Sequence, residues 1–266
     1  MINFTLLKKE FKSNISILIT FMSILSMYGI VMISMFDPKL GESLKLMSEN
    51  MPEMFALFGM NNFSSNLMDF LINYLYSFLL IVLPLVFIII LVHRLIIKYI
   101  DRGIIVYLLA TPNSRIKIIS TQILNGILEI FLLNIYITIL YIIVSEAMFK
   151  GELDIIKLII VNIGLFSLWF AFLGICFLSS VIFNSSSVSL WAGSGFCIIS
   201  ILLQMISRVG DKAEIFQYFS LITLFSPSKY STDFNLFLLG TISLFVIGII
   251  TYIIKIFIFN KRDIYV

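Results

Sequence analysis

Charged side chains are scarce in this sequence. Asp, Glu, Lys and Arg make up 12% of its 266 residues, whereas a soluble domain carries about 25%. Hydrophobic residues make up 60%, and the mean hydropathy is +1.08. So little charge excludes an ordinary soluble domain, and the composition predicts an integral membrane protein in contact with the lipid bilayer.

The residue types that build catalytic and metal sites are also scarce. The chain has one His, His93, and two Cys, Cys176 and Cys197, which leaves little material for a catalytic triad or a metal site. Both cysteines fall in apolar runs, which favours small packing residues over a disulfide. No Gly-x-x-x-x-Gly-Lys-Ser/Thr run binds nucleotide phosphates. We therefore expect that the chain is not an enzyme and holds no metal or cofactor.

What the sequence does contain is long apolar runs. Six of them are long enough to cross the hydrocarbon layer as helices, which takes about 18 to 20 residues: 15–36, 70–92, 118–144, 157–183, 188–206 and 234–259. Continuous runs, unlike alternating ten-residue segments, exclude a transmembrane barrel. The predicted fold is a single all-α transmembrane domain, residues 1–266, with six membrane-spanning helices.

The distribution of Lys and Arg predicts which side holds the termini. Six spans place both termini on one side, together with ten basic residues: Lys8, Lys9, Lys12, Arg94, Lys98, Arg102, Arg115, Lys117, Lys261 and Arg262. Seven lie on the other side: Lys39, Lys45, Lys150, Lys157, Arg208, Lys212 and Lys229. Because Lys and Arg near span ends favour the cytoplasm, we expect both termini to be cytoplasmic.

Residues 2–13, before the first span, have an amphipathic pattern. Phe4, Leu7 and Phe11 share one helical face, and three lysines occupy the rest. This pattern is typical of a helix that lies in the headgroup plane. We expect an N-terminal interface helix here, and a frayed tail is the alternative.

The connection between the fifth and sixth spans contains a second apolar segment. Ile215 to Phe225 covers eleven residues, too few to cross the bilayer, and Ser226-Pro227 interrupts it. The pattern predicts an extracellular re-entrant or interfacial hairpin before the last span.

Two residues inside the spans carry local expectations. Pro84 lies in the second span and should kink that helix, because proline removes a backbone hydrogen bond. Lys255 lies near the inner end of the last span, and we expect its side chain to extend toward the headgroups.

The third span carries a polar face formed by Gln122, Asn125, Glu129 and Tyr136. Glu129 is twelve residues after Lys117, which is about 18 Å along a helix and close to the middle of the bilayer. An ionised carboxylate there costs on the order of 3 kcal/mol, so it should face protein or water. Two interpretations stay open: a hydrogen bond to a neighbouring helix, or a place along the substrate route.

In the fifth span Ser189, Gly193 and Cys197 recur every four residues. Small side chains at this spacing allow helix backbones to approach closely. We expect a packing face, either within the chain or at a subunit interface.

The segment from Lys98 to Lys117, between the second and third spans, combines charges with a helical apolar pattern. Asp101 suits a helix N-cap, and an apolar stripe that includes Leu108 and Leu109 follows it. Because proline disfavours helix in the residue before it and favours the first turn after it, Thr111-Pro112 should end this helix and cap the third span. We expect a short amphipathic helix over residues 101–110.

This segment resembles the first cytoplasmic loop of the permease subunits of type-2 ABC exporters. That loop runs acidic residue, Gly, apolar residues, Leu-Leu, a small residue, Thr/Ser-Pro and a Ser-Arg pair. The matching residues are Asp101, Gly103, Leu108, Leu109, Ala110, Thr111, Pro112, Ser114 and Arg115. The order of six spans after an amphipathic start also resembles the family over nearly the whole chain.

The resemblance implies a coupling helix at about 101–110 that contacts a separate ATPase. The residues implied in this contact are Asp101, Arg102, Gly103, Leu108, Leu109, Thr111, Pro112 and Arg115. It further implies a multi-pass permease of the bacterial cell membrane that pairs with a second copy or a paralogue and with cytoplasmic ATPase subunits, which bind ATP and Mg. No nucleic-acid partner is implied.

The implied function is ATP-driven export of amphipathic or hydrophobic cargo, such as a peptide or drug, which suits a bundle rich in Phe and Met. The main alternative is an ion-coupled secondary transporter that uses Glu129 as its proton site. A membrane enzyme or assembly factor is a third possibility, although no catalytic cluster supports it.

Overall fold

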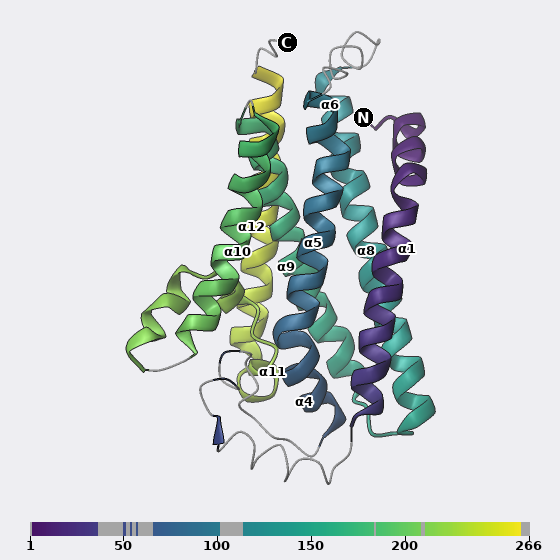
Figure 1. The fold of residues 1–266 in the computed structure, drawn as a ribbon, viewed down its shortest axis with the longest axis vertical. Helices are drawn as coiled ribbons and strands as arrows, with labels where there is room; N and C mark the ends of the chain where they lie inside the picture. The colour runs from purple at the N-terminus through teal and green to yellow at the C-terminus, as the bar shows by residue number, and fades with distance from the viewer. Residues whose placement is uncertain are drawn as a thin grey trace.

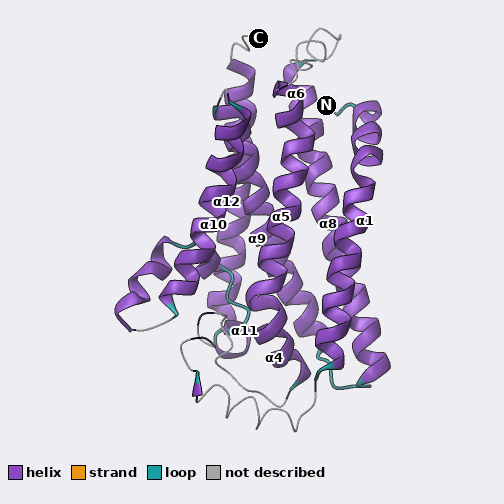
Figure 2. Cartoon of the chain, viewed as in Figure 1, coloured by secondary structure: helices purple, strands orange, loops and turns teal. Residues whose placement is uncertain are grey.

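The computed structural model describes residues 2–36, 50, 51, 54, 57, 66–101, 114–183, 185–208 and 211–261. Within these residues the secondary structure is helical, with no strand (Figure 2). Six helices are long and apolar enough to cross a membrane. The predicted all-α fold with six spans is confirmed, and the chain is a multi-pass membrane protein by the length and composition of its helices.

The first, third, fourth, fifth and sixth spans are each one uninterrupted helix: α1 (Phe4–Ser34), α8 (Arg115–Met148), α9 (Ile155–Ile182), α10 (Ser186–Ser207) and α12 (Phe234–Lys261). The second span is built from several consecutive pieces: α4 (Leu67–Leu71), the π-helix η1 (Ile72–Leu79), α5 (Leu80–Val92), the π-helix η2 (His93–Ile97) and α6 (Lys98–Asp101).

The bundle is organised around α9, which is the most deeply buried span. Helix α9 packs against α12, α10, α5 and α8, whereas α1 packs chiefly against α8 (Figure 1). Large side chains on α9 fill the space between these neighbours, and Trp169, Phe172 and Phe177 are fully buried. These side chains form an aromatic layer on α9, within a hydrophobic core to which every span contributes. The outer faces of the other spans carry exposed Ile, Leu, Val and Phe side chains, as a lipid-facing surface requires.

The start of α1, the end of α6, the start of α8 and the end of α12 all lie at one end of the bundle (Figure 1), which we call the N/C end. Residues 2–13, predicted as an interface helix, contain the first turns of α1, and no break separates them from the span. Asn3 caps α1 by accepting from the backbone N–H of Thr5 and Leu6. Its own N–H donates to Thr121 Oγ1 at 2.9 Å, so the starts of α1 and α8 are tied together.

Pro84, which is predicted to kink the second span, lies inside α5, and the hydrogen bond that it removes is replaced by one from another helix. Proline lacks an N–H, so the carbonyl of Leu80, four residues earlier, has no partner in its own helix. Trp169 on α9 donates its indole N–H to that carbonyl at 2.9 Å. A neighbouring helix thus supplies the donor that proline removes, which is how membrane helices tolerate proline.

The segment predicted to form a hairpin folds as η3 (Asp211–Phe219), η4 (Leu221–Leu224) and α11 (Lys229–Thr232). It lies toward the end opposite the N/C end (Figure 1). Ser220 Oγ donates to the carbonyl of Ser200 and the N–H of Leu221 donates to Ser200 Oγ, both at 2.8 Å. Helix α10 therefore fixes the turn between η3 and η4, and leaves Tyr218 and Phe219 exposed.

Candidate functional site

Buried polar side chains gather between α1, α8 and the end of the second span, in the half of the bundle nearer the N/C end. We call this group the polar cluster: Glu10 and Asn14 from α1, Gln122, Asn125 and Glu129 from α8, and Tyr99 from α6. The α1 pair is spaced by four residues and the α8 set by three and four, so each set lies on one helical face. All but the half-buried Tyr99 are buried, and Glu129 is 1% exposed.

Glu129 is held by two amides. Its Oε1 atom accepts from Asn14 Nδ2 at 3.0 Å and from Asn125 Nδ2 at 2.7 Å. Asn125 is one turn earlier on the same helix, whereas Asn14 belongs to α1. The sequence left open whether Glu129 bonds a neighbouring helix, and the structure supplies that bond.

Glu10 forms the second carboxylate of the cluster. The hydroxyl of Tyr99 donates to Glu10 Oε1 at 2.5 Å, which links α1 to α6. Arg94 on η2 donates to the carbonyl of Ser13 at 3.3 Å, next to Asn14 in the chain. Neither carboxylate has an ion-pair partner among the described residues. The ion pair of Lys157 with Asp69 lies near the other end of the bundle.

Several acceptor atoms of the cluster have no hydrogen-bond partner among the described residues. They are Asn14 Oδ1, Gln122 Oε1, Asn125 Oδ1 and Glu129 Oε2. Buried polar atoms are satisfied in the large majority of cases. These four acceptors have no donor, and no donor of the cluster is unpartnered among these buried atoms. The polar cluster is therefore a candidate binding site.

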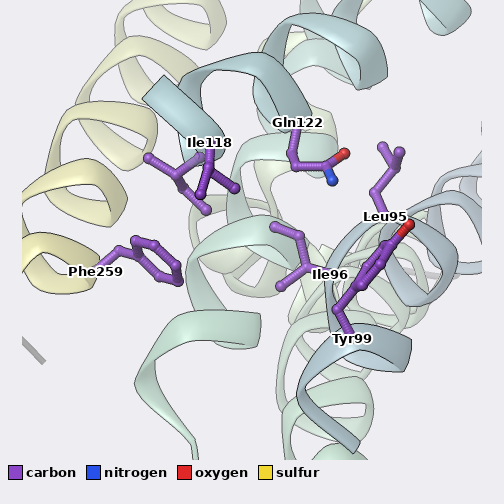
Figure 3. Close-up of a pocket in the computed structure, with 7 residues that line it drawn as sticks. Leu95, Ile96, Tyr99, Ile118, Gln122 and Phe259 are labelled. Carbon is purple, nitrogen blue, oxygen red and sulfur yellow. The ribbon is translucent and has the colours of Figure 1, made fainter. Parts of the chain in front are cut away.

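Gln122 also lines a small cavity at the N/C side of the cluster. The lining is otherwise almost entirely apolar and consists of Leu95, Ile96, Tyr99, Ile118, Ile119, Gln122 and Phe259 (Figure 3). The volume of about 20 Å³ is enough for one water molecule. The Gln122 amide is directed toward the side of the cavity formed by Leu95 and Tyr99 (Figure 3).

The structure separates the four polar residues predicted on the third span. Gln122, Asn125 and Glu129 belong to the polar cluster, but Tyr136 does not. Its hydroxyl lies 2.7 Å from Ser26 Oγ, about two turns after Glu129 on α8 and about three turns after Asn14 on α1. Tyr136 therefore joins α1 to α8 as a separate contact.

Sequence reasoning missed the residues that α1 and α6 contribute, namely Glu10, Asn14 and Tyr99. The signal was present, because Glu10 and Asn14 are polar residues one helical turn apart. For that segment the sequence predicts an apolar face of Phe4, Leu7 and Phe11 in the headgroup plane and says nothing of the face that Glu10 and Asn14 share. In the structure Phe4 is 76% exposed and Glu10 4% exposed, so the polar face is the one that points into the protein.

Most residues predicted to contact an ATPase lie outside the described residues: Arg102, Gly103, Leu108, Leu109, Thr111 and Pro112. Asp101 is the last residue of α6 and Arg115 the first of α8. The expectation that Thr111 caps the third span is wrong. Ser114 is the N-cap of α8, and its hydroxyl accepts from the N–H of Lys117 at 3.3 Å, because the helix starts later than the Thr-Pro pair indicated.

The small-residue face of α10 lies against α9 of the same chain. A Cβ atom on Gly193 would be 2.3 Å from Ser179 Oγ and 2.9 Å from Cys176 Cα. Ser179 Oγ also donates to the carbonyl of Ser189 at 2.9 Å, and Cys197 is fully buried. Of the two placements that the sequence allowed, the structure has the contact within the chain.

The expected extension of Lys255 toward the headgroups is wrong. Lys255 is fully buried on α12, with its Nζ atom 3.5 Å from the centroid of the Phe177 ring. The nitrogen has no hydrogen-bond partner within the described ranges. The ring face of Phe177 attracts the cation, and the packing of α12 on α9 holds the side chain inward.

Comparisons with known proteins identify no relative of this chain. No family model matches the sequence, and no curated protein and no solved structure matches it. Within the described residues no group of three or more His, Cys, Asp or Glu side chains is placed to hold a metal ion. The function must therefore be argued from the placement of the residues themselves.

Proposed function

We propose that this chain is the membrane-spanning permease subunit of an ATP-driven exporter that moves amphipathic or hydrophobic cargo outward. An amphipathic peptide is the cargo class we favour. The observation that carries the proposal is the position of the segment that resembles a coupling helix. The described residues on either side of that segment, the end of α6 and the start of α8, lie at the N/C end, where α1 begins and α12 ends (Figure 1).

The N/C end also carries a concentration of basic side chains, of which Lys8, Lys9, Lys12 and Lys98 are exposed. Positive charge near span ends favours the cytoplasmic face. On this orientation the 102–113 connection meets the cytoplasm, where separate ATPase subunits bind ATP and Mg. The complex we propose has two permease copies, or this chain with a paralogue, in a bacterial cell membrane.

A mechanical route from the ATPase into the bundle follows from the hydrogen bond between Asn3 and Thr121. This bond ties the first turns of α1 and α8, and α8 begins only two residues after the 102–113 connection. A push on that connection therefore reaches both helices together. Tilting of α1 and α8 as a pair, relative to the group formed by α9, α10 and α12, is the movement we propose for transport.

A second candidate function is ion-coupled transport with Glu129 as the proton site. The observation that favours it is the second carboxylate oxygen of Glu129, which is buried and has no hydrogen-bond partner in the part of the chain that the structure describes. A transporter that is driven by proton exchange at this carboxylate needs no ATPase. The two candidates therefore differ in their energy source, which reconstitution can measure.

The test is transport by the purified chain in liposomes, with and without the ATPase that co-purifies from native membranes. For the exporter we expect ATP-dependent flux of a fluorescent amphipathic peptide, lost in Leu108→Asp because a carboxylate disrupts an apolar coupling face. Glu129→Gln should keep this flux, since the amide preserves size. Flux driven by a pH gradient alone and abolished by Glu129→Gln would instead establish the second candidate and exclude the first.

A further inference from the structure

The polar cluster has a surplus of buried hydrogen-bond acceptors. The two amide nitrogens that face Glu129 are already used by its Oε1 atom, while Asn14 Oδ1, Asn125 Oδ1 and Glu129 Oε2 have no partner. Each amide oxygen is bonded to the same carbon as its nitrogen, so amide geometry places both oxygens within about 5 Å of Glu129 Oε1. Two buried amide oxygens without donors among the described residues thus lie near a carboxylate whose own second oxygen also has none.

The charge of the cluster points in the same direction. Glu10 and Arg94 are the charged side chains that act electrostatically on Glu129. Lys9 and Lys98 act on Glu10, so Arg94 is the one basic side chain among the described residues that acts on Glu129. A buried carboxylate without an ion-pair partner among the described residues is costly, and one positive charge beside Glu129 would compensate it.

We propose that Asn14, Asn125 and Glu129 form a binding site for a dehydrated monovalent cation of about the size of Na⁺. Oxygen ligands alone are the chemistry of hard cations. A divalent ion such as Ca²⁺ ordinarily takes six to eight oxygens that include several carboxylates, and this site offers one carboxylate and two amides. One negative charge with neutral amide oxygens matches a single positive charge.

The amides can serve both the free and the bound state of this site. Half a turn of each terminal amide exchanges its nitrogen for its oxygen with little change in shape, and the two assignments are nearly isosteric. With no cation the NH₂ groups of Asn14 and Asn125 donate to Glu129. With a cation the two oxygens turn toward Glu129 Oε1 and share the ion with it. Because Asn14 is on α1 and Asn125 on α8, binding would tighten the contact between these helices.

The oxygen of Gln122 has no partner among the described residues, and it indicates that a cation reaches this site from the N/C side. Gln122 is one helical turn before Asn125 and lines the cavity of about 20 Å³ next to Tyr99. A cation that passes this cavity exchanges its water for the Gln122 oxygen before it reaches the amides. The site belongs to the folded chain alone, so it does not depend on an ATPase, on cargo or on the direction of transport.

The test measures cation binding to the purified full-length chain in detergent. Its melting temperature is recorded in NaCl, KCl and choline chloride at equal ionic strength, and ²²Na⁺ binding is measured by equilibrium dialysis. We expect a saturable rise in melting temperature with NaCl that exceeds the effect of choline chloride, and a stoichiometry of one Na⁺ per chain. Because a ligand of the native state alone stabilises by mass action, the two measurements should give the same dissociation constant.

Three variants assign the site. Glu129→Gln and Asn14→Leu should each weaken Na⁺ binding by at least tenfold. The matched control is Asn134→Leu, which removes a buried amide of α8 that donates to the carbonyl of Asn162 at 3.2 Å and should leave Na⁺ binding unchanged. If Glu129→Gln does not fold, Asn14→Leu and Asn134→Leu decide the comparison.

Three results would overturn the proposal. One is an equal effect of Na⁺ and choline on melting, which indicates ionic strength alone. Another is ²²Na⁺ binding that survives in Asn14→Leu and Glu129→Gln. The third is stabilisation by low pH with no response to Na⁺ at high pH, which indicates that a proton alone neutralises Glu129. Failure of ATP-driven transport leaves these binding measurements untouched, so the two proposals fail separately.

Discussion

At the scale of single residues, Pro84 and Trp169 show how a helix-breaking residue is accommodated in the core. The carbonyl of Leu80 lacks its usual donor because Pro84 has no N–H, and the Trp169 indole replaces it at 2.9 Å. A buried carbonyl without a donor costs about 1 to 3 kcal/mol. The aromatic residue on α9 is therefore matched to the proline on α5, although 85 positions separate them in the chain.

We predict that Trp169→Phe lowers the free energy of unfolding by about 2 kcal/mol or more, because it removes the indole donor as well as apolar volume. In a Pro84→Ala background the loss should be smaller by about 1 kcal/mol, since the backbone N–H of the introduced alanine then bonds the Leu80 carbonyl. Thermal unfolding of the four proteins of this double-mutant cycle in detergent measures the difference. Equal losses in both backgrounds would show that Trp169 acts through packing alone.

The sequence predicts the surroundings of the buried Glu129 better than those of the buried Lys255. Glu129 could be predicted to face protein or water, because its distance from Lys117 set its depth. Its partner Asn14 could not, since 115 residues separate the two and only the pairing of α1 with α8 brings them together. Lys255 was misplaced because a lysine near a span end usually extends outward, and the competing attraction of the Phe177 ring depends on how α12 packs on α9.

At the scale of elements, the contact between α9 and α10 depends on glycine. Gly193 faces Ser179 and the backbone of Cys176, whereas Gly195, two residues later, has nothing within 4 Å of the position its Cβ would take. On the same helix, Gly193 thus allows a close contact with α9, whereas Gly195 has no neighbour. This pair separates the steric role of glycine from its low helix propensity.

We predict that Gly193→Ala destabilises the protein by about 1 to 3 kcal/mol, because the added methyl overlaps Ser179 Oγ and presses on α9. The control Gly195→Ala should be neutral or stabilise by up to about 1 kcal/mol, since alanine favours helix and meets no neighbour. Melting temperatures of both variants in one detergent test this contrast. An equal response of the two glycines would mean that propensity, not the α9 contact, governs this face.

The sequence predicted the existence of these elements better than their internal form. Uninterrupted apolar runs specify α9 and α12, because length and hydropathy alone decide whether a helix can cross the bilayer. The π-helical pieces η1 and η2 in the second span have no comparable signal. A π-turn inserts one extra residue per turn without changing composition, so hydropathy does not register it.

At the scale of the whole molecule, the bundle has two groups of helices. One is the pair of α1 with α8, and the other is α9 with α10 and α12, while the second span contacts both groups. The polar cluster lies on the side of α1 and α8, and the aromatic layer belongs to α9. A movement of one group against the other would therefore change the surroundings of Glu129 and also the contact of α8 with α9, where Gly126 faces Phe177.

Sidedness is the property of the whole molecule on which both transport proposals depend. Cys176 and Cys197 are buried, so a cysteine placed on the surface can be labelled with little background. Lys9, near the N/C end, and Lys150, in the turn after α8 at the opposite end, are both exposed.

We predict that a membrane-impermeant maleimide labels Lys150→Cys in intact cells and labels Lys9→Cys only after permeabilisation, because the basic N/C end faces the cytoplasm. Lys98→Cys, at the end of the second span, should behave like Lys9→Cys and serves as an independent check. Labelling of Lys9→Cys and Lys98→Cys in intact cells would place the 102–113 connection outside, where no cytoplasmic ATPase can reach it, and would exclude the proposed exporter.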